Sequence, residues 1–515
     1  MIIRWTILTF ALLSPWMPQH LHAQGQSQPA AASGAGFAFV SAQDGGLGST
    51  MTLSQLQQVQ KKADEAASPL SVSPAAEPVP ALRYHLYPRQ SELRPGSALL
   101  HYARAQILYQ QMAKDVTTEW NTWATEEVRP TDEQLAAVVG SLKHVYVELH
   151  ELAMSEDFTW DHRIRDLRGP EVYAYLLPDV QEARAMALLL RIKIMHQIRQ
   201  KDFEGVFSSV SDGFRLAEFV GQGETLIQKL VGIAIAAIIR DALEDAISTP
   251  GCPNLYWAIA SVPQPLVNVG QSAVWELDNI HRVLPALAEA ESAEWSEAQA
   301  TQKWASLVSD LGALSGDASP AGRDSQLALA LASVTFVDSA RQRLQVGGVE
   351  ADRLSKLPAL QVVLMDAARE VRRVGDDLAK AHLLPAHLAK PLLEREDAEF
   401  RQWLGDNRLS SVGAAIGGLL FPAVKQVMEA ETRMLVGHAR LMTLEAIRMY
   451  ASEHDGELPN SLDQLTTVPA MSDPYTNQPF EYRVEDIDGR PTLTLTAAGP
   501  TNFRPLQVLR ATIAK

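Results

Sequence analysis

The sequence lacks several features that would reveal chemistry directly. Its 515 residues include one cysteine, Cys252, so no internal disulfide can form and stability must come from core packing. The patterns H-E-x-x-H, G-x-S-x-G and C-x-x-C and the phosphate-binding glycine loop do not occur in it. The strongest sequence signals for zinc proteases, serine hydrolases, redox cysteine pairs and nucleotide hydrolases are therefore missing.

The chain also lacks an excess of basic residues. It carries 45 Lys and Arg against 61 Asp and Glu, a formal charge of -16, and shows no basic stripe. We therefore expect no nucleic-acid partner. Long apolar runs are scarce beyond the N-terminus, since the uncharged stretch at residues 230–239 is shorter than the roughly 20 residues that a bilayer requires.

The N-terminus resembles a secretory signal. Arg4 precedes an apolar segment at residues 5–13, Pro15 interrupts it, and Ala23 ends the segment. We expect cleavage after Ala23, a periplasmic or secreted location and no membrane span in the mature chain; an uncleaved anchor is the alternative. Residues 24–80 are rich in Ala, Gln, Ser, Gly and Pro, which predicts a disordered linker.

The body of the chain is organised around residues 181–247. Met186, Leu190 and Ile194 recur at every fourth position, which predicts an amphipathic helix. A second helix from residue 203 folds back on it, and a third at residues 226–247, capped by Thr225, is apolar on every side. We predict a mainly α fold of stacked helical hairpins, either a tetratricopeptide-like solenoid or a bundle, over residues 81–430.

The last part, residues 431–515, has a different character. A long helix is predicted at residues 423–452, with Gly456 as its left-handed cap. A short helix follows, and strands at residues 480–484 and 492–496 flank a turn at Asp486 and Gly489, which predicts a β-hairpin. Upstream, Pro285 should kink or break one helix, while residues 351–381 should form another.

Three resemblances follow from short motifs. The segments at residues 166–170, 176–179, 253–257 and 446–451 resemble a family of long secreted bacterial proteins with no assigned activity. The hairpin at residues 181–217 is similar to tetratricopeptide-type repeats, with Phe203 after the turn, although Val206 departs from the small residue of that pattern. The tail resembles the globular part of type II secretion pseudopilins in Gly456–Pro459, Asp473, Pro474 and Tyr482.

The best candidate site is the charged loop at residues 161–171. An anionic group could bind there, and the alternative is that its arginines pair with Asp161, Asp166 and Glu171 to fix the loop. Aromatic residues could line a nearby groove or simply belong to the core. The candidate binding residues are His162, Arg163, Arg165, Arg168, Tyr256 and Trp257.

We expect no metal and no cofactor. His144 and His150 are six residues apart and do not share a helix face as metal ligands would. Asp486 and Asp488 beside Gly489 are typical of a turn, although calcium binding is the alternative.

Our leading hypothesis is a non-enzymatic binding or scaffold protein with a protein or peptide partner. The alternatives are a hydrolase whose acid and base come from distant parts of the sequence, and a component of an envelope or secretion assembly.

Overall fold

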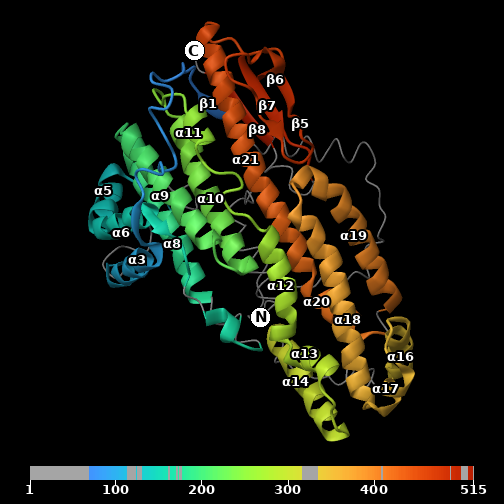
Figure 1. The fold of residues 1–515 in the computed structure, drawn as a ribbon. Helices are drawn as coiled ribbons and strands as arrows, with labels where there is room; N and C mark the ends of the chain where they lie inside the picture. Colours follow the sequence, from blue (N-terminus) through green and yellow to red (C-terminus); the bar gives the residue numbers. More distant parts are fainter. Residues whose placement is uncertain are drawn as a thin grey trace, which may run out of the picture.

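The computed structural model describes residues 69–112, 123, 130–160, 163–169, 172, 177–315, 335–407, 410–487, 489–499 and 508–513. Within them the fold is mainly helical, with a small sheet near the C-terminus, as the sequence predicts. Figure 1 shows two groups of helices with one long helix between them. The predicted signal segment and most of the predicted linker lie outside the described residues.

The predicted central hairpins are confirmed. Helices α8 (Leu177–Arg199), α9 (Phe203–Gly221) and α10 (Leu226–Ile247) follow one another and pack side by side. The link between α8 and α9 is tight because Lys201 adopts φ 56° and Asp202 accepts a hydrogen bond from the Gly205 N–H. Thr225 caps α10, in a reciprocal capping box with Gln228.

The first half of helix α10, residues 226–236, is buried on all sides, as its sequence predicts. Val231, Ile235 and Ile239 are all at 0% exposure, and neighbouring helices surround them. No helix in the described part of the chain is long and apolar enough to cross a membrane.

The remaining helices form the flanks. Proline accounts for two interruptions, since it lacks an N–H and disfavours helical backbone at the residue before it. The predicted break at Pro285 is confirmed, whereas the single helix predicted at residues 351–381 is wrong, because Pro358 separates two helices. The flanking helices are α3 (Ala98–Met112), α5 (Asp132–Ser141), α6 (Lys143–Ala153), α11 (Tyr256–Ala260), α12 (Gly270–Val283), α13 (Pro285–Ser292), α14 (Glu297–Ser315), α16 (Val337–Val346), α17 (Ala351–Lys356), α18 (Ala359–Lys380), α19 (Ala386–Asn407) and α20 (Val412–Leu420).

The long helix α21 (Pro422–Glu453) is 32 residues long, which corresponds to about 48 Å. It runs between the α8–α11 group and the α18–α20 group (Figure 1). Gly456 adopts φ 83° and its N–H donates to the Ala451 carbonyl, so the predicted left-handed cap is confirmed. The predicted division at residues 430/431 falls inside this helix.

The predicted hairpin is present as β6 (Glu481–Ile487) and β7 (Arg490–Thr496), which pair antiparallel. It belongs to a larger sheet of order β1-β8-β7-β6. Strand β8 (Val508–Ile513) pairs antiparallel with β7, and β1 (Leu70–Val72) pairs parallel with β8. Strand β1 corrects the linker prediction, which extended to residue 80: its backbone pairs with β8, and Val72 is buried.

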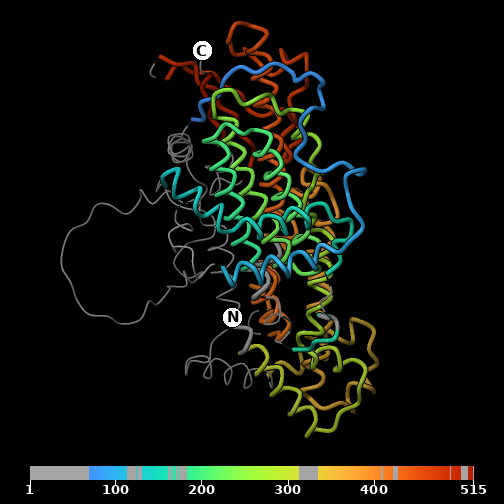
Figure 2. The backbone as a smooth tube through the Cα atoms, turned by 90° about the vertical axis from the view of Figure 1, so that its left-hand side faces the viewer, coloured from blue at the N-terminus to red at the C-terminus, as the bar shows by residue number. Residues whose placement is uncertain are grey.

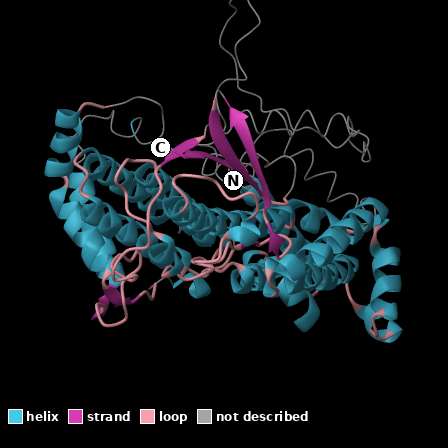
Figure 3. Ribbon diagram, turned by 90° about the horizontal axis from the view of Figure 1, so that it is seen from above, coloured by secondary structure: helices cyan, strands magenta, loops and turns pink. Residues whose placement is uncertain are grey.

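The two ends of the described chain therefore meet at one end of the molecule, as the blue and red segments of Figure 2 show. Leu493 and Leu495 of β7 are fully buried in the same hydrophobic core as the helices. Viewed from above, the long strands lie near the middle with helices extending to both sides (Figure 3). The C-terminal unit is thus docked on the helical body. Shorter strand pairs join β2 (Arg94–Ser97) with β3 (Ser155–Asp157) and β4 (Ser472–Asp473) with β5 (Gln478–Pro479).

Candidate functional site

The predicted charged loop is described only in part. His162 and the side chains of Arg163 and Arg165 lie outside the described residues, although Arg163–Asp166 form a short 3-10 turn. Arg168 is exposed, and its Nη1 donates to the neighbouring Leu167 carbonyl at 3.0 Å. The Gly169 N–H donates to the carbonyl of Arg282 in the last turn of α12 at 3.1 Å. This part of the loop is fastened to the end of a helix.

Tyr256 and Trp257 lie on α11, at the other end of the molecule from the end of α12 (Figure 1). The Tyr256 hydroxyl donates to the Pro469 carbonyl at 2.9 Å, and Trp257 Nε1 donates to Glu77 at 2.6 Å. Both rings therefore join α11 to other segments of the chain. The structure does not bring them to the described part of the charged loop.

The histidines behave as separate residues. His150 Nδ1 lies 2.9 Å from Asp212 Oδ1 of α9, and His144 is exposed. Asp488 lies outside the described residues. Within the residues that are described, no group of three or more His, Cys, Asp or Glu side chains is placed to hold a metal ion.

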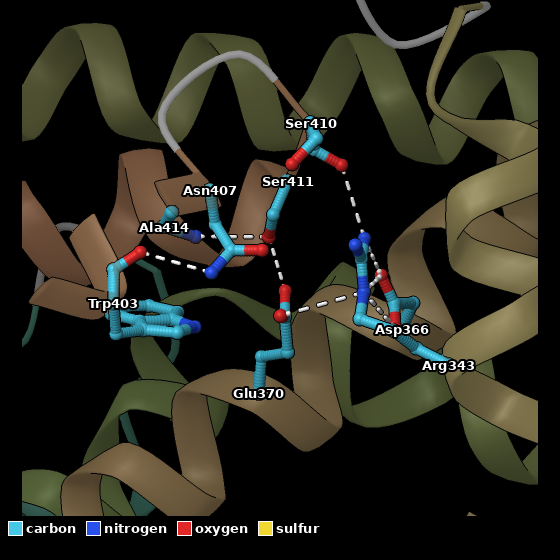
Figure 4. A network of polar contacts seen from close by, with 8 residues as sticks. All are labelled: Arg343, Asp366, Glu370, Trp403, Asn407, Ser410, Ser411 and Ala414. Atoms are coloured by element: carbon cyan, nitrogen blue, oxygen red, sulfur yellow. Dashed lines mark hydrogen bonds and ion pairs between the residues drawn. The ribbon is translucent and has the colours of Figure 1, made fainter. Parts of the chain in front are cut away.

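A polar network fastens α20 to α18 (Figure 4). The Ser411 hydroxyl caps α20 and donates to the buried carboxylate of Glu370. Arg343 holds Asp366 through Nε at 3.1 Å and Nη2 at 2.6 Å, and Nη2 also donates to the Ser410 carbonyl. Burial raises the pKa of Asp366 to about 6. The network holds the turn before α20 in place and is structural.

A second structural network surrounds Arg448 of α21, which is 1% exposed. Arg448 Nη1 lies 2.7 Å from Glu445, and the guanidinium also donates to the carbonyls of Ser73 and Cys252 at 2.8 Å each. Glu445 in turn accepts the Leu255 N–H at 2.6 Å. The segments at residues 253–257 and 446–451 meet at this network.

A third group of charged side chains lies between α8, α10 and α21, and here the pairing is loose. The shortest contacts are 3.4 Å between Arg240 and Asp241, 3.5 Å between Arg191 and Asp245, and 3.6 Å between Arg240 and Glu244. We call this group the interhelical charge cluster; it comprises Arg191, Arg240, Asp241, Glu244, Asp245 and Arg440.

Arg440 is the least satisfied member of the cluster. It is 6% exposed, and its Nε and Nη1 have no hydrogen-bond partner among the described residues. Burial lowers the pKa of Arg440 to about 10, which the more distant charges of Glu244, Asp241 and Asp473 partly oppose. Asp473 is already occupied, because its oxygens accept the N–H groups of Tyr475 and Ala498.

Gly437 makes room for a second guanidinium beside Arg440. A Cβ at this position would lie 2.2 Å from Arg240 Nη1, so the Arg240 side chain lies directly over the glycine. The nearby charge of Arg240 also lowers the pKa of Arg440. Two guanidinium groups held together in this way are a common arrangement for binding an anion.

The cluster has an open side and a closed side. The Asp245 side chain is 58% exposed and that of Arg191 22%, whereas that of Asp241 is 5% exposed. Exposure therefore falls from the rim towards Asp241 and Arg440. Among the described residues, the groups without hydrogen-bond partners lie at the closed side.

A buried lysine and glutamate lie further along the same α10–α21 contact. Lys229 Nζ donates to the Gly221 carbonyl at 2.5 Å, and Glu431 accepts the Val269 N–H at 3.2 Å. Burial lowers the pKa of Lys229 to about 8 and raises that of Glu431 to about 7. The charge of Glu431 opposes the shift of the Lys229 pKa. The shift of the Glu431 pKa is opposed first by the Val269 N–H and then by the charge of Lys229.

Sequence reasoning missed the interhelical charge cluster. Its only sequence signals were Arg240 and Asp241 directly after the apolar run of α10, and Gly437 within an otherwise helical pattern. Comparisons with models of protein families, with curated proteins and with solved structures found no match for this chain. The geometry of the described residues is therefore the basis of the functional proposal.

Proposed function

We propose that this protein is a helical binding protein that takes a small polar molecule with an anionic group at the interhelical charge cluster. The observation that carries the proposal is Arg440, a buried guanidinium with two nitrogens that have no hydrogen-bond partner among the residues that the structure describes. The signal-like features of residues 1–23 support a periplasmic or secreted location as part of the same proposal.

The physical basis is the cost of an uncompensated buried charge. An arginine stays protonated, and burying its charge costs several kcal/mol unless a partner supplies opposite charge and hydrogen-bond acceptors. A carboxylate or phosphate supplies both, since its oxygens match the planar fork of a guanidinium. Arg240, held over Gly437, offers a second fork beside the first.

The fold is suited to such a task. Arg440 and Arg240 lie within long helices of the core, so their backbones are held rigidly. Sites on rigid elements lose little conformational entropy when a ligand binds. The role of the helical scaffold in this proposal is to keep two like charges close together until an anion arrives.

The proposal is tested by measuring the Tm of the purified protein with acetate, phosphate and a panel of small carboxylic acids. We expect at least one of them to raise the Tm in proportion to the logarithm of its concentration. Arg440→Met should abolish the rise. Arg401→Met is the matched control, since Arg401 is an exposed arginine on α19 paired with Asp397, and it should retain the rise.

Salt effects are separated from binding by comparing the variants. A Tm rise that is equal in the protein and in Arg440→Met would come from ionic strength alone and would contradict the proposal. Failure of every acid to raise the Tm would contradict it as well.

A further inference from the structure

The interhelical charge cluster contains groups of both signs. Arg191, Arg240 and Arg440 are its guanidinium groups, and Asp241, Glu244 and Asp245 are its carboxyl groups. Burial raises the pKa of Asp241 to about 7, so its negative charge, like the positive charge of Arg440, is poorly compensated. A ligand that carries one positive and one negative group would offer a partner to both residues.

The unsatisfied atoms of the cluster are of both kinds. Within the described part of the chain, Nε and Nη1 of Arg440 and Nε of Arg240 are buried donors without an acceptor. Oδ2 of Asp241 is, within the same residues, a buried acceptor without a hydrogen-bond donor. A simple carboxylate satisfies the arginines and leaves Asp241 as it was. An ammonium group beside that carboxylate would donate to Asp241.

Asp241 is well placed to be the second contact. It is adjacent in sequence to Arg240, its Oδ1 lies 3.4 Å from Arg240 Nη2, and its charge acts on Arg440. Its Oδ2 is 3.9 Å from Arg191 Nη1, too far for a hydrogen bond. Carboxylate and guanidinium thus face the same closed side of the cluster.

Building on the proposed function, we propose that the ligand is a zwitterion of the α-amino acid class. Its carboxylate is held by Arg440 and Arg240, and its ammonium group by Asp241. The rest of the ligand points towards the exposed rim at Asp245 and Arg191, where its side chain would remain in contact with solvent.

The first test compares three kinds of probe on the intact protein by isothermal titration calorimetry. The probes are the twenty common amino acids, the N-acetyl derivative of whichever binds most tightly, and the amide of that amino acid. We expect the free amino acid to bind and each derivative to bind at least tenfold more weakly, because acetylation removes the ammonium charge and amidation removes the carboxylate.

The second test uses variants of the two contacts. In Asp241→Asn the preference for the free amino acid over its N-acetyl derivative should disappear, whereas Arg440→Met should abolish binding of both. Asp397→Asn, a change of a partly buried α19 carboxylate outside the cluster, is the control and should keep the preference. The probe comparison in the unmodified protein needs no variant, so it decides the question even if Asp241→Asn does not fold.

The outcomes separate the two proposals. Equal, Arg440-dependent binding of the free and N-acetylated forms would overturn the zwitterion and leave the anion-binding function standing. This result would also be expected if the site accepts the carboxy terminus of a peptide. If none of the probes binds, both proposals are overturned. Ordered water would then be the partner of the buried polar atoms.

Discussion

Arg448 and Arg440 lie about two turns apart on α21, and both are buried, yet their surroundings are opposite. Arg448 contacts Glu445 and three backbone carbonyls, those of Ser73, Cys252 and Pro253. Arg440 has two nitrogens without any hydrogen-bond partner in the described part of the chain. One side chain holds the fold together, and the other adds a charge that the fold does not neutralise.

The difference follows from what each arginine faces. Arg448 faces the loops at residues 73–75 and 252–255, whose carbonyls are not used by a helix and can accept hydrogen bonds. Arg440 faces the middle of α10, whose carbonyls already bond within the helix. A buried arginine between helices must find side chains or a ligand as partners. The position against loops or against helices therefore separates the structural role of Arg448 from the binding role that we propose for Arg440.

The largest effect is expected for Arg448→Met. Removing the guanidinium leaves Glu445 as a buried charge without its partner, and such changes cost about 3–5 kcal/mol. The free energy of unfolding, measured by urea titration, should fall by that amount. A loss below about 1 kcal/mol would show that Arg448 is not a structural tie.

Arg440→Met, by contrast, should raise the free energy of unfolding or leave it unchanged. Replacing an uncompensated buried charge by an apolar side chain of similar length is neutral or stabilising by about 1–4 kcal/mol. The same urea titration, performed without added ligand, measures the change. A destabilisation as large as that of Arg448→Met would mean that Arg440 has a partner and would remove the contrast.

The carboxylates of α21 extend the comparison to pH. Glu445 is paired, whereas burial raises the pKa of Glu431 from 4.5 to about 7. A raised folded-state pKa gives stability that is present below pH 4.5 and is lost as the pH rises through 7. Lys229, whose pKa is lowered to about 8, stays charged over most of this range and contributes little to the change.

Glu431→Gln should therefore lose less stability than the unmodified protein between pH 5 and pH 8. The difference should be on the order of 1–3 kcal/mol, since one pKa unit corresponds to about 1.4 kcal/mol. Urea titrations at the two pH values measure it. If the free energy of unfolding changed equally with pH in both proteins, the pKa of Glu431 would be the same in the folded and unfolded states.

The smallest change in stability is expected for Gly437→Ala. The new methyl group would meet the end of the Arg240 side chain, which can move, while alanine favours the helix by up to about 1 kcal/mol. We expect the free energy of unfolding to change by less than about 1 kcal/mol but ligand affinity to fall at least tenfold. Unchanged affinity would show that the position of Arg240 over Gly437 is not needed for binding.

Much of the fold could be predicted because the signals were local. Apolar spacing in α8 and α10, the caps at Thr225 and Gly456 and the break at Pro285 each depend on neighbouring residues. Strand β1 could not be predicted, because its three residues are a strand only through pairing with β8 at the other end of the chain. The local sequence around it, rich in small and polar residues, is typical of a linker.

The site was harder to predict than the fold for the same reason. Arg191, Arg240 and Arg440 come from three helices that are distant in sequence, and each looks like an ordinary charged residue of an amphipathic helix. Only the packing of α10 against α21 shows that Arg440 faces inwards. The charged loop was conspicuous because its candidate residues lie close together in the sequence, namely His162, Arg163, Arg165 and Arg168. A binding role for them stays a prediction.

The parallel pairing of β1 with β8 also constrains the order of events during synthesis. Leu70 pairs with Ala511, so in a chain that emerges N-terminus first the helical segments between them are synthesised before β1 can pair with β8. The helical body can form earlier from local contacts, whereas pairing between distant segments is slow. We therefore expect the sheet to be completed after the helical body.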